Sequence, residues 1–170
     1  NKMIFLDAKP NKANLKLAEM EQAGKLSAIV TQNIDGLHQA AGSKNVFELH
    51  GSVHRNYCQK CGKFFDVNYV VNAKGVPYCD ECGGIIKPDV VLYEEGLDSQ
   101  TINGAVRAIS KADMLIIGGT SLVVYPAAGM IDYFKGKYLA VLNRDATSRD
   151  KQADLCITDP IGEVLGRIRV

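Results

Sequence analysis

Four of the five cysteines have the spacing of a zinc site. Two C-x-x-C pairs, Cys58 with Cys61 and Cys79 with Cys82, are separated by 17 residues, and a glycine follows each second cysteine. A glycine there permits the tight turn that directs both sulfurs of a pair inward. Two such pairs supply the four thiolates of a tetrahedral Zn²⁺ site, and the alternative is a set of free or redox-active thiols.

A zinc ion with four thiolate ligands has no open position for water, which a catalytic zinc requires. The predicted Zn²⁺ is therefore structural. It would stabilise a small lobe of residues 57–87, which is too short to build a core of its own. The fifth cysteine, Cys156, lies in an apolar run and is expected to be a buried strand thiol without a role.

Strand and helix signals alternate in the rest of the chain, which predicts an α/β fold with a Rossmann-like parallel sheet formed by residues 1–56 and 88–170. The predicted helices are 12–23, 100–111, 126–134 and a last one that begins at Pro160 with Asp159 as its cap. The predicted strands are 27–31, 46–49, 90–93, 114–117, 138–142 and 155–158. The turns after residues 31, 117 and 142 would line one sheet edge, where open α/β sheets bind ligands.

The composition excludes several kinds of function. The chain has 170 residues, of which 46% are hydrophobic and 23% are charged, and its net charge is +1. Such a balance gives no electrostatic attraction to nucleic acid or to an anionic membrane. No apolar stretch approaches the roughly 20 residues of a membrane span. The odd number of cysteines argues against a secreted disulfide framework and favours a reducing cytoplasm.

Several short motifs, in one order, resemble those of the bacterial-type sirtuins, which are NAD-dependent protein-lysine deacylases. They are A-K-P-N at 8–11, T-Q-N-I-D-G-L-H at 31–38, E-L-H-G at 48–51, the two cysteine pairs, K-P-D-V-V at 87–91, G-T-S-L at 119–122 and V-Y-P-A-A at 124–128. Each motif is weak alone, but their order is specific. The resemblance implies that the acyl group of an acylated protein lysine is transferred to ADP-ribose, with NAD as cofactor and release of nicotinamide.

The resemblance assigns the role of general base to His50, the histidine of E-L-H-G. His50 would take a proton from a ribose hydroxyl, and a neutral imidazole near pH 7 suits that task. Taken alone, this histidine could simply end a strand. His38 and His54 do not match the position of the base and are expected to be structural.

The resemblance also implies residues that bind the cofactor and the substrate. The residues expected at the nicotinamide and its ribose are Gln32, Asn33, Ile34 and Asp35. Those expected at the phosphates and the adenosine are Gly119, Thr120, Ser121, Asn143, Arg144, Asp145 and Ile161. Those expected to pair with the peptide and to wall the acyl-lysine tunnel are Val90, Val91, Leu92 and Tyr93. Without the resemblance, the segments 32–35 and 119–121 could be ordinary turns.

Sirtuins begin with a strand and a glycine-rich G-A-G-x-S loop, followed by a segment with F-R, and these have no counterpart in this sequence. The favoured expectation is a natural protein that starts several tens of residues earlier, and the alternative is a truly short protein. The 170 residues by themselves are expected to be weak or inactive, because part of the phosphate site is lacking.

Two other functions are compatible with the same motifs. An ADP-ribosyltransferase could use the same activated ribose with another nucleophile, and a catalytically inactive module could bind zinc and NAD alone. A zinc ribbon that binds nucleic acid would need a basic surface around the cysteines. Asp66, Asp80 and Glu81 offset the lysines of that segment, which disfavours the nucleic-acid reading.

Overall fold

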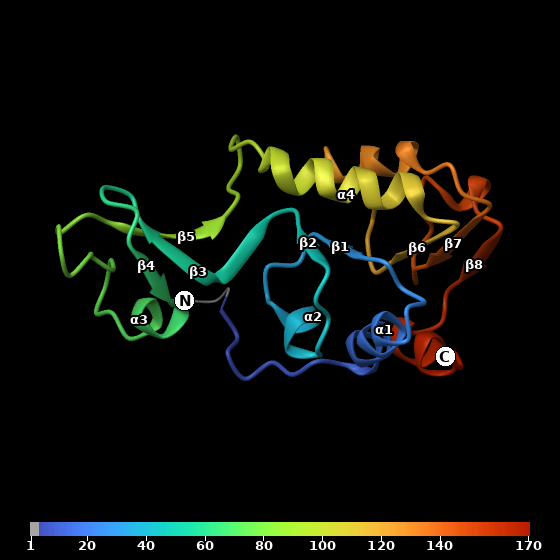
Figure 1. Cartoon of the computed structure of the whole chain (residues 1–170), viewed down its shortest axis with the longest axis horizontal. Helices are drawn as coiled ribbons and strands as arrows, with labels where there is room; N and C mark the ends of the chain where they lie inside the picture. The colour runs from blue at the N-terminus through green and yellow to red at the C-terminus, as the bar shows by residue number, and fades with distance from the viewer. Residues whose placement is uncertain (1–3) are drawn as a thin grey trace. The chain divides into compact units, whose positions relative to one another are not determined.

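The computed structural model describes residues 4–170, which divide into two compact units (Figure 1). The first unit consists of residues 4–8, Thr31–Gly36 and Glu48–Leu97. The second consists of Lys9–Val30, Leu37–Phe47 and Asp98–Val170. Among the residues described, no helix has the length and apolar character that crossing a membrane requires.

The first unit contains a three-stranded antiparallel sheet in the order β4-β3-β5. Its elements are β3 (Gly51–Cys58), β4 (Phe64–Asp66), α3 (Val67–Val71) and β5 (Ile86–Val90). Helix α3 follows β4 directly because the Asp66 carboxylate accepts a hydrogen bond from the Tyr69 N–H and caps the helix. One small buried cluster of this unit includes two of the cysteines; it consists of Cys58, Phe65, Cys79 and Ile86.

The ladder between β3 and β5 is interrupted by a bulge. Ser52 lies opposite Asp89, but the next pair is Asn56 with Pro88, so residues 53–55 of β3 have no partners on β5. Proline lacks a backbone N–H and is tolerated in sheets at bulges and edges, which explains its position at this break. The bulge leaves backbone donors of β3 available for other contacts.

The predicted strand 90–93 is wrong beyond its first residue. Strand β5 ends at Val90, and a turn follows at residues 93–94. The Lys87 ammonium donates hydrogen bonds to the Val90 carbonyl and to the Glu95 carboxylate, and Glu95 also accepts from the Leu92 N–H. These side-chain bonds close a turn where the apolar run V-V-L-Y suggested a continued strand.

The second unit is built on a three-stranded parallel sheet in the order β6-β7-β8. Its strands are β6 (Met114–Gly118), β7 (Tyr138–Leu142) and β8 (Leu155–Ile157). Its helices are α1 (Lys12–Gln22), α2 (Leu37–Ala40), α4 (Ser99–Lys111), α5 (Ile161–Gly166) and the 3-10 helices η1 (Ala127–Tyr133) and η2 (Asp150–Gln152). Gly118, Leu142 and Ile157 are in register, so the carboxyl ends of all three strands lie at one edge.

Strand β7 shows how this sheet is covered on both faces. Ala140 and Leu142 pack in a cluster with residues of α1 and α5, whereas Leu139 and Val141 pack in a second cluster with residues of η1. Alternate side chains of a strand point to opposite faces, so the two clusters are the two faces of the sheet. Helix α1 lies beside α5, and α4 packs against η1 (Figure 1).

The helix boundaries confirm most of the predictions. Asn11 caps α1, because its side-chain oxygen accepts hydrogen bonds from the Ala13 and Asn14 N–H groups, and Asp98 caps α4. The predicted cap Asp159 is wrong, because Pro160 occupies the N-cap position of α5 and no side chain bonds there. The segment predicted as helix 126–134 is a 3-10 helix, η1.

Strands β1 (Ile29–Thr31) and β2 (Val46–Glu48) form a separate two-stranded sheet. The sequence predicted that the turns after residues 31, 117 and 142 would line one sheet edge. The turn after Thr31 instead follows a strand of this separate sheet, so it does not share a hydrogen-bonded sheet with the turns after β6 and β7. Cys156 also departs from expectation, because it is exposed on β8. Within the part of the chain described, β8 is an outer strand with little cover, which explains the exposed thiol.

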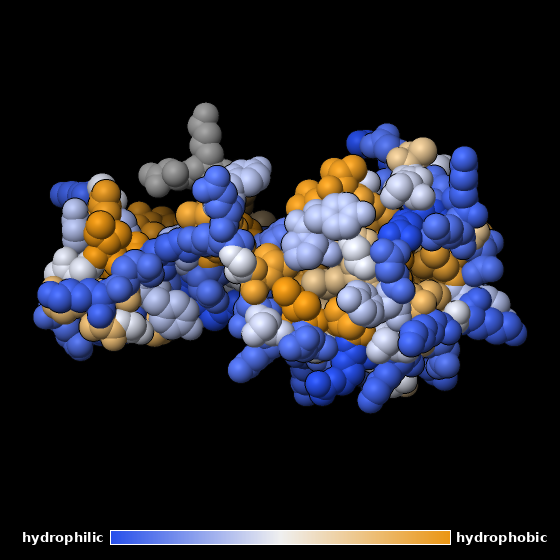
Figure 2. Space-filling model, turned by 90° about the horizontal axis from the view of Figure 1, so that it is seen from above, coloured by the Kyte–Doolittle hydropathy of each residue, from blue (hydrophilic) through white to orange (hydrophobic). Residues whose placement is uncertain are grey.

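Large hydrophobic side chains remain exposed in both units, and Figure 2 shows several orange patches among hydrophilic side chains. The most exposed of these large hydrophobic residues are Tyr93, Phe5, Tyr125 and Val123. Tyr93 stands at the turn that ends the β5 segment, in the region predicted to contact a peptide.

Candidate functional site

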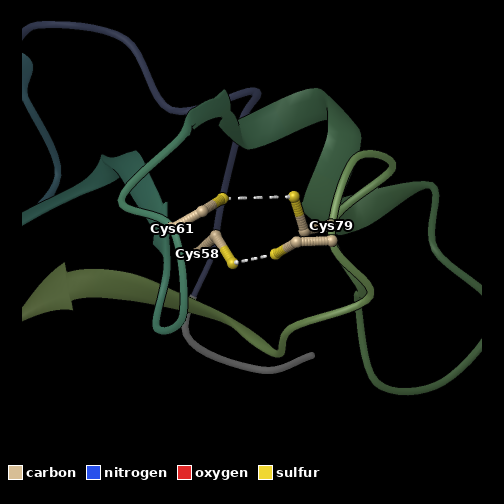
Figure 3. A group of neighbouring side chains, drawn as sticks. Cys58, Cys61 and Cys79 are labelled. Carbon is tan, nitrogen blue, oxygen red and sulfur yellow. Dashed lines mark hydrogen bonds between the residues drawn. The ribbon is translucent and has the colours of Figure 1, made fainter.

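The four predicted zinc ligands come together in the first unit. All four sulfurs lie within 4.8 Å of one another and point toward a common centre (Figure 3). The sulfurs of Cys58 and Cys82 are 3.4 Å apart, and those of Cys61 and Cys79 are 3.7 Å apart. A tetrahedron with Zn–S bonds of about 2.3 Å has S–S edges of roughly 3.8 Å, so the four residues fit Zn²⁺.

Both cysteine turns have the backbone geometry that the sequence predicted. The Gly62 N–H donates to the Cys58 carbonyl at 2.9 Å, and the Gly83 N–H donates to the Cys79 carbonyl at 3.0 Å. Both glycines have positive φ, of 73° and 67°. A third glycine was not foreseen: a Cβ on Gly84 would lie 2.7 Å from the Cys58 sulfur.

The pKa values of two of the thiols shift in opposite directions. The pKa of Cys58 falls to about 6, because the Cys61 N–H and then the Lys60 N–H donate to its sulfur and outweigh burial. The pKa of Cys61 rises to about 12: the Lys63 N–H lowers it, but the neighbouring Cys82 thiol and burial outweigh that donor. Such a cluster stabilises one thiolate and resists the formation of further ones. A bound dication would compensate their negative charge and so allow all four thiols to serve as thiolate ligands.

Lys63 links the two cysteine turns through charge. Its ammonium lies 2.7 Å from the Asp80 carboxylate and 2.8 Å from that of Glu81, and 5.4 Å from the centre of the Phe65 ring. The hydrogen bonds to Asp80 and then to Glu81 raise the pKa of Lys63. The sequence showed balanced charges in this segment, but only the fold shows that one lysine joins the two turns.

His50, the predicted base, is anchored in the first unit by its Nδ1 atom. This atom lies 3.1 Å from the carbonyl oxygen of Gln32. A carbonyl only accepts hydrogen bonds, so Nδ1 carries the proton of the neutral ring. The Nε2 atom then has the free electron pair that a general base requires.

The glycine after the base is fixed by sterics. Gly51 has a φ of 74°, and a Cβ at this position would overlap the carbonyl oxygen of Asp89 on β5. The residue before Gly51 is also held to this segment, since the Val91 N–H donates to the His50 carbonyl at 3.1 Å. Any larger residue at position 51 would therefore separate β3 from β5 beside His50.

The glutamate of E-L-H-G has a structural partner. The Arg55 guanidinium donates to the carboxylate of Glu48 at 2.7 Å and to that of Asp89 at 2.8 Å. The Glu48 side chain is only 8% exposed, so its charge needs this partner. Burial lowers the pKa of Arg55, but the hydrogen bonds to the two carboxylates outweigh burial and raise it. No local sequence signal indicates this bridge.

The segment predicted to hold nicotinamide runs along the start of β3. Beside the bond between His50 and Gln32, the Val53 N–H donates to the Ile34 carbonyl at 3.0 Å. The His54 Nε2 atom lies 2.9 Å from the Asp35 carbonyl oxygen. His54 was expected only to be structural, yet it contacts the loop next to the base.

The predicted substrate residues Val90, Val91, Leu92 and Tyr93 lie on the end of β5 and in the turn after it. Glu94 in this turn has a φ of 71°. This left-handed conformation costs a non-glycine residue of order 1 kcal/mol, so the turn keeps a glycine-like backbone without glycine. The pKa of Glu95 is lowered by hydrogen bonds from the Leu92 N–H and from Lys87.

The second unit positions the predicted adenosine residues at the carboxyl edge of its sheet. Gly119 follows β6 with a φ of 61°, and a Cβ there would meet no atom within 4 Å. Its N–H donates to the Leu142 carbonyl, and the Asn143 N–H donates to the Ile157 carbonyl. The Asn143 side chain donates to the Asp145 carbonyl and so closes the turn that carries Arg144.

Residue Ile161 reaches the same edge from α5. A Cβ on Gly118 would overlap the Ile161 side chain, so the two residues are in close contact. Thr120 and Ser121 follow Gly119, and the Thr120 hydroxyl accepts a hydrogen bond from the Leu122 N–H. Open backbone at a glycine, next to hydroxyl groups, fits the sugar and phosphate parts of a dinucleotide.

A parallel α/β sheet with a polar carboxyl edge, together with a four-cysteine lobe, defines the class as a nucleotide-binding fold with a structural metal site. The family model described as "Sir2 family" matches residues 1–126. The chain belongs to the Sir2 family.

Relatives and solved structures of the family cover most of the chain. An NAD-dependent protein deacetylase of Clostridium acetobutylicum is 67% identical over 96% of this chain and 67% of its own length. One from Clostridium perfringens is 64% identical over 98% of this chain and 69% of its own length. The structure "Sir2-p53 peptide-NAD+" is 40% identical with a TM-score of 0.89, and "Sir2 bound to acetylated peptide" is 39% identical with a TM-score of 0.88; each match covers 95% of this chain and 70% of the solved one.

Proposed function

We propose that this protein is an NAD-dependent protein-lysine deacetylase, which transfers the acyl group of an acylated lysine to ADP-ribose and releases nicotinamide. The observation that carries the proposal is the fixed tautomer of His50, whose Nδ1 donates to the Gln32 carbonyl and leaves Nε2 as a base. The relatives named NAD-dependent protein deacetylase, and the related Sir2 structures with acetylated peptide and NAD+, support it.

The residues of the first unit would perform the proton transfer. NAD, when bound, supplies the ribose carbon that receives the acyl oxygen as nicotinamide leaves. His50 Nε2 takes the proton of a ribose hydroxyl, and the Gln32 carbonyl stabilises the imidazolium that results, since Nδ1–H still donates to it. Gln32, Asn33, Ile34 and Asp35 would orient the nicotinamide and its ribose.

In the second unit, the predicted phosphate and adenosine residues would contact a nucleotide. The open backbone at Gly119 and the hydroxyls of Thr120 and Ser121 suit ribose and phosphate oxygens, since glycine permits close approach and hydroxyls donate. The turn of Asn143, Arg144 and Asp145 would hold the second ribose, and Ile161 would contact the adenine.

The substrate would be an extended peptide with an acylated lysine. Val90, Val91, Leu92 and Tyr93 offer an apolar surface, which suits a lysine that has lost its charge. Pairing through the backbone would read the peptide with little dependence on its side chains.

Zn²⁺ would be structural. Cys58, Cys61, Cys79 and Cys82 would fill its coordination shell and stabilise a lobe whose predicted bounds are 57–87. We place the NAD-binding domain at residues 1–56 and 88–170, and we expect the protein in the cytoplasm because its cysteines fit a reducing compartment.

The test is an assay of the intact protein with an acetyl-lysine peptide and NAD. Peptide mass and released nicotinamide are followed for the wild type, for His50→Ala and for the control His38→Gln. NAD-dependent loss of acetyl, abolished by His50→Ala only, supports the proposal. Transfer of ADP-ribose to protein without deacetylation would identify an ADP-ribosyltransferase instead. A folded protein without either reaction would refute the enzyme function.

A further inference from the structure

His54 is a titratable side chain beside the proposed active site that the mechanism does not use. Its Nε2 lies 2.9 Å from the Asp35 carbonyl oxygen, so the ring N–H donates a hydrogen bond to that carbonyl. A Cβ on Gly36 would lie 2.8 Å from the His54 Cδ2 atom, so the ring also packs closely against the loop. The backbone of His54 is fixed in turn, since its N–H donates to the hydroxyl of the buried residue Ser52.

Three hydrogen bonds tie residues 32–36 to the start of β3. The Gln32 carbonyl accepts from His50, the Ile34 carbonyl from the Val53 N–H, and the Asp35 carbonyl from His54. The bulge in β3 leaves the Val53 N–H available for the middle bond, because residues 53–55 have no ladder partners on β5. The first and last of the three bonds depend on side chains, and the middle one on the backbone alone.

The two side-chain bonds have different consequences. His50 holds the beginning of the loop and is also the base, so changing it alters the chemistry directly. His54 holds the other end, next to Gly36, whose φ is 67°. Glycine allows many backbone conformations, so the loop depends on external contacts at that end for its order.

We propose that His54 is a positioning residue that holds residues 32–36 in the conformation that receives the nicotinamide end of NAD. The inference rests on the proposed function in one respect, the assignment of nicotinamide to this loop. Without the bond to Asp35, the loop samples other conformations, and the cofactor must order it on binding. The bond of His50 to Gln32 remains, so the proton-transfer step is unaffected.

Three variants separate the hydrogen bond from the ring. In His54→Gln, the amide nitrogen can occupy the place of Nε2 and still donate. In His54→Asn, the amide is too short to reach the Asp35 carbonyl. In His54→Phe, a ring still packs against Gly36 but has no donor.

The kinetic expectation follows from the strength of one neutral hydrogen bond. His54→Asn and His54→Phe are expected to raise the KM for NAD roughly three- to tenfold, and the nicotinamide concentration for half-inhibition by a similar factor. Nicotinamide responds because it is a product that rebinds the same loop. The kcat is expected to stay within about twofold of the wild type, and His54→Gln is expected to restore both constants.

Hydrogen exchange provides a measurement that does not depend on turnover. In the intact protein without NAD, the amides of residues 33–36 are expected to exchange roughly three- to tenfold faster in His54→Asn and His54→Phe, and at the wild-type rate in His54→Gln. Exchange in β3 and β5 should be unchanged in all three variants.

The inference would be overturned by unchanged exchange in every variant, or by faster loop exchange with no change in the KM for NAD. A fall in kcat that matches the rise in KM, or a Gln variant that behaves like the Asn variant, would also overturn it, because the ring would then act through general structure. A wild-type protein without deacetylation would refute the proposed function, while the exchange results would still decide whether His54 orders the loop.

Discussion

The four-cysteine lobe of the first unit and the parallel sheet of the second unit are stabilised in different ways. The sheet buries aliphatic side chains on both faces, with Ala140, Leu142 and Leu165 in one cluster and Ile117, Leu139 and Val141 in the other. The buried cluster described around the cysteines of the lobe is small, and two of its four members are cysteines. Hydrophobic burial can stabilise the sheet, whereas the lobe depends on its metal and on ion pairs.

The largest expected effect is the loss of zinc. Cys79→Ser, or treatment with a chelator, is expected to unfold the lobe and abolish deacetylation, because one turn loses its ligand and the remaining core is too small. The parallel sheet should keep its slow hydrogen exchange. Zinc content by atomic absorption and exchange by mass spectrometry check this, and equal protection of the lobe without metal would contradict the comparison.

Gly51→Ala is expected to be the next most damaging change. Its Cβ would overlap the Asp89 carbonyl oxygen, so β3 and β5 must separate beside His50. We expect deacetylation to fall at least about a hundredfold, since misplacement of a catalytic group by about 1 Å has that effect. The zinc content should be retained.

Gly24→Ala is the matched control for Gly51→Ala. Gly24 has a similar φ of 69°, but a Cβ there would meet no atom within 4 Å. Gly24→Ala should therefore lower the free energy of unfolding by only about 1 kcal/mol, which is the cost of a left-handed backbone conformation at a non-glycine residue. Its kcat should be unchanged. If the two variants were equally impaired, backbone strain rather than the contact with Asp89 would explain the loss.

Leu165→Ala tests the contribution of hydrophobic burial to the stability of the second unit. Leu165 is 1% exposed in the cluster between the sheet and its helices α1 and α5. Its truncation is expected to lower the free energy of unfolding by about 2–5 kcal/mol, as measured by urea denaturation. Zinc affinity should not change, and a parallel loss of zinc would show that the two units do not keep separate sources of stability.

Lys63→Gln is expected to have the smallest effect. It removes the cation that joins Asp80 and Glu81 to the first cysteine turn, but these groups are exposed and solvent screens them. The rate of zinc release to a chelator should rise by about two- to fivefold at low salt, and the difference should shrink at high salt. The control Lys74→Gln, on an exposed residue of the same unit, should release zinc at the wild-type rate.

The zinc ligands and the strands of the parallel sheet could be predicted because their signals are local. The C-x-x-C spacing needs only a turn and a glycine, and the run M-L-I-I is long enough in apolar residues to mark β6. The end of β5 could not be predicted, because a bond from the Lys87 side chain terminates it. The partners of Glu48 and Asp35 are 7 and 19 residues away, so only the fold identifies Arg55 and His54.

The exposed thiol on β8 has a practical consequence. When zinc occupies the four clustered sulfurs, Cys156 is the remaining cysteine of the five, and it is open to solvent. A maleimide dye should therefore attach at this one position of the metal-loaded protein. Release of the metal would unfold the lobe and expose its four thiols as further attachment points, so the number of dyes per chain would report zinc occupancy in a single mass spectrum.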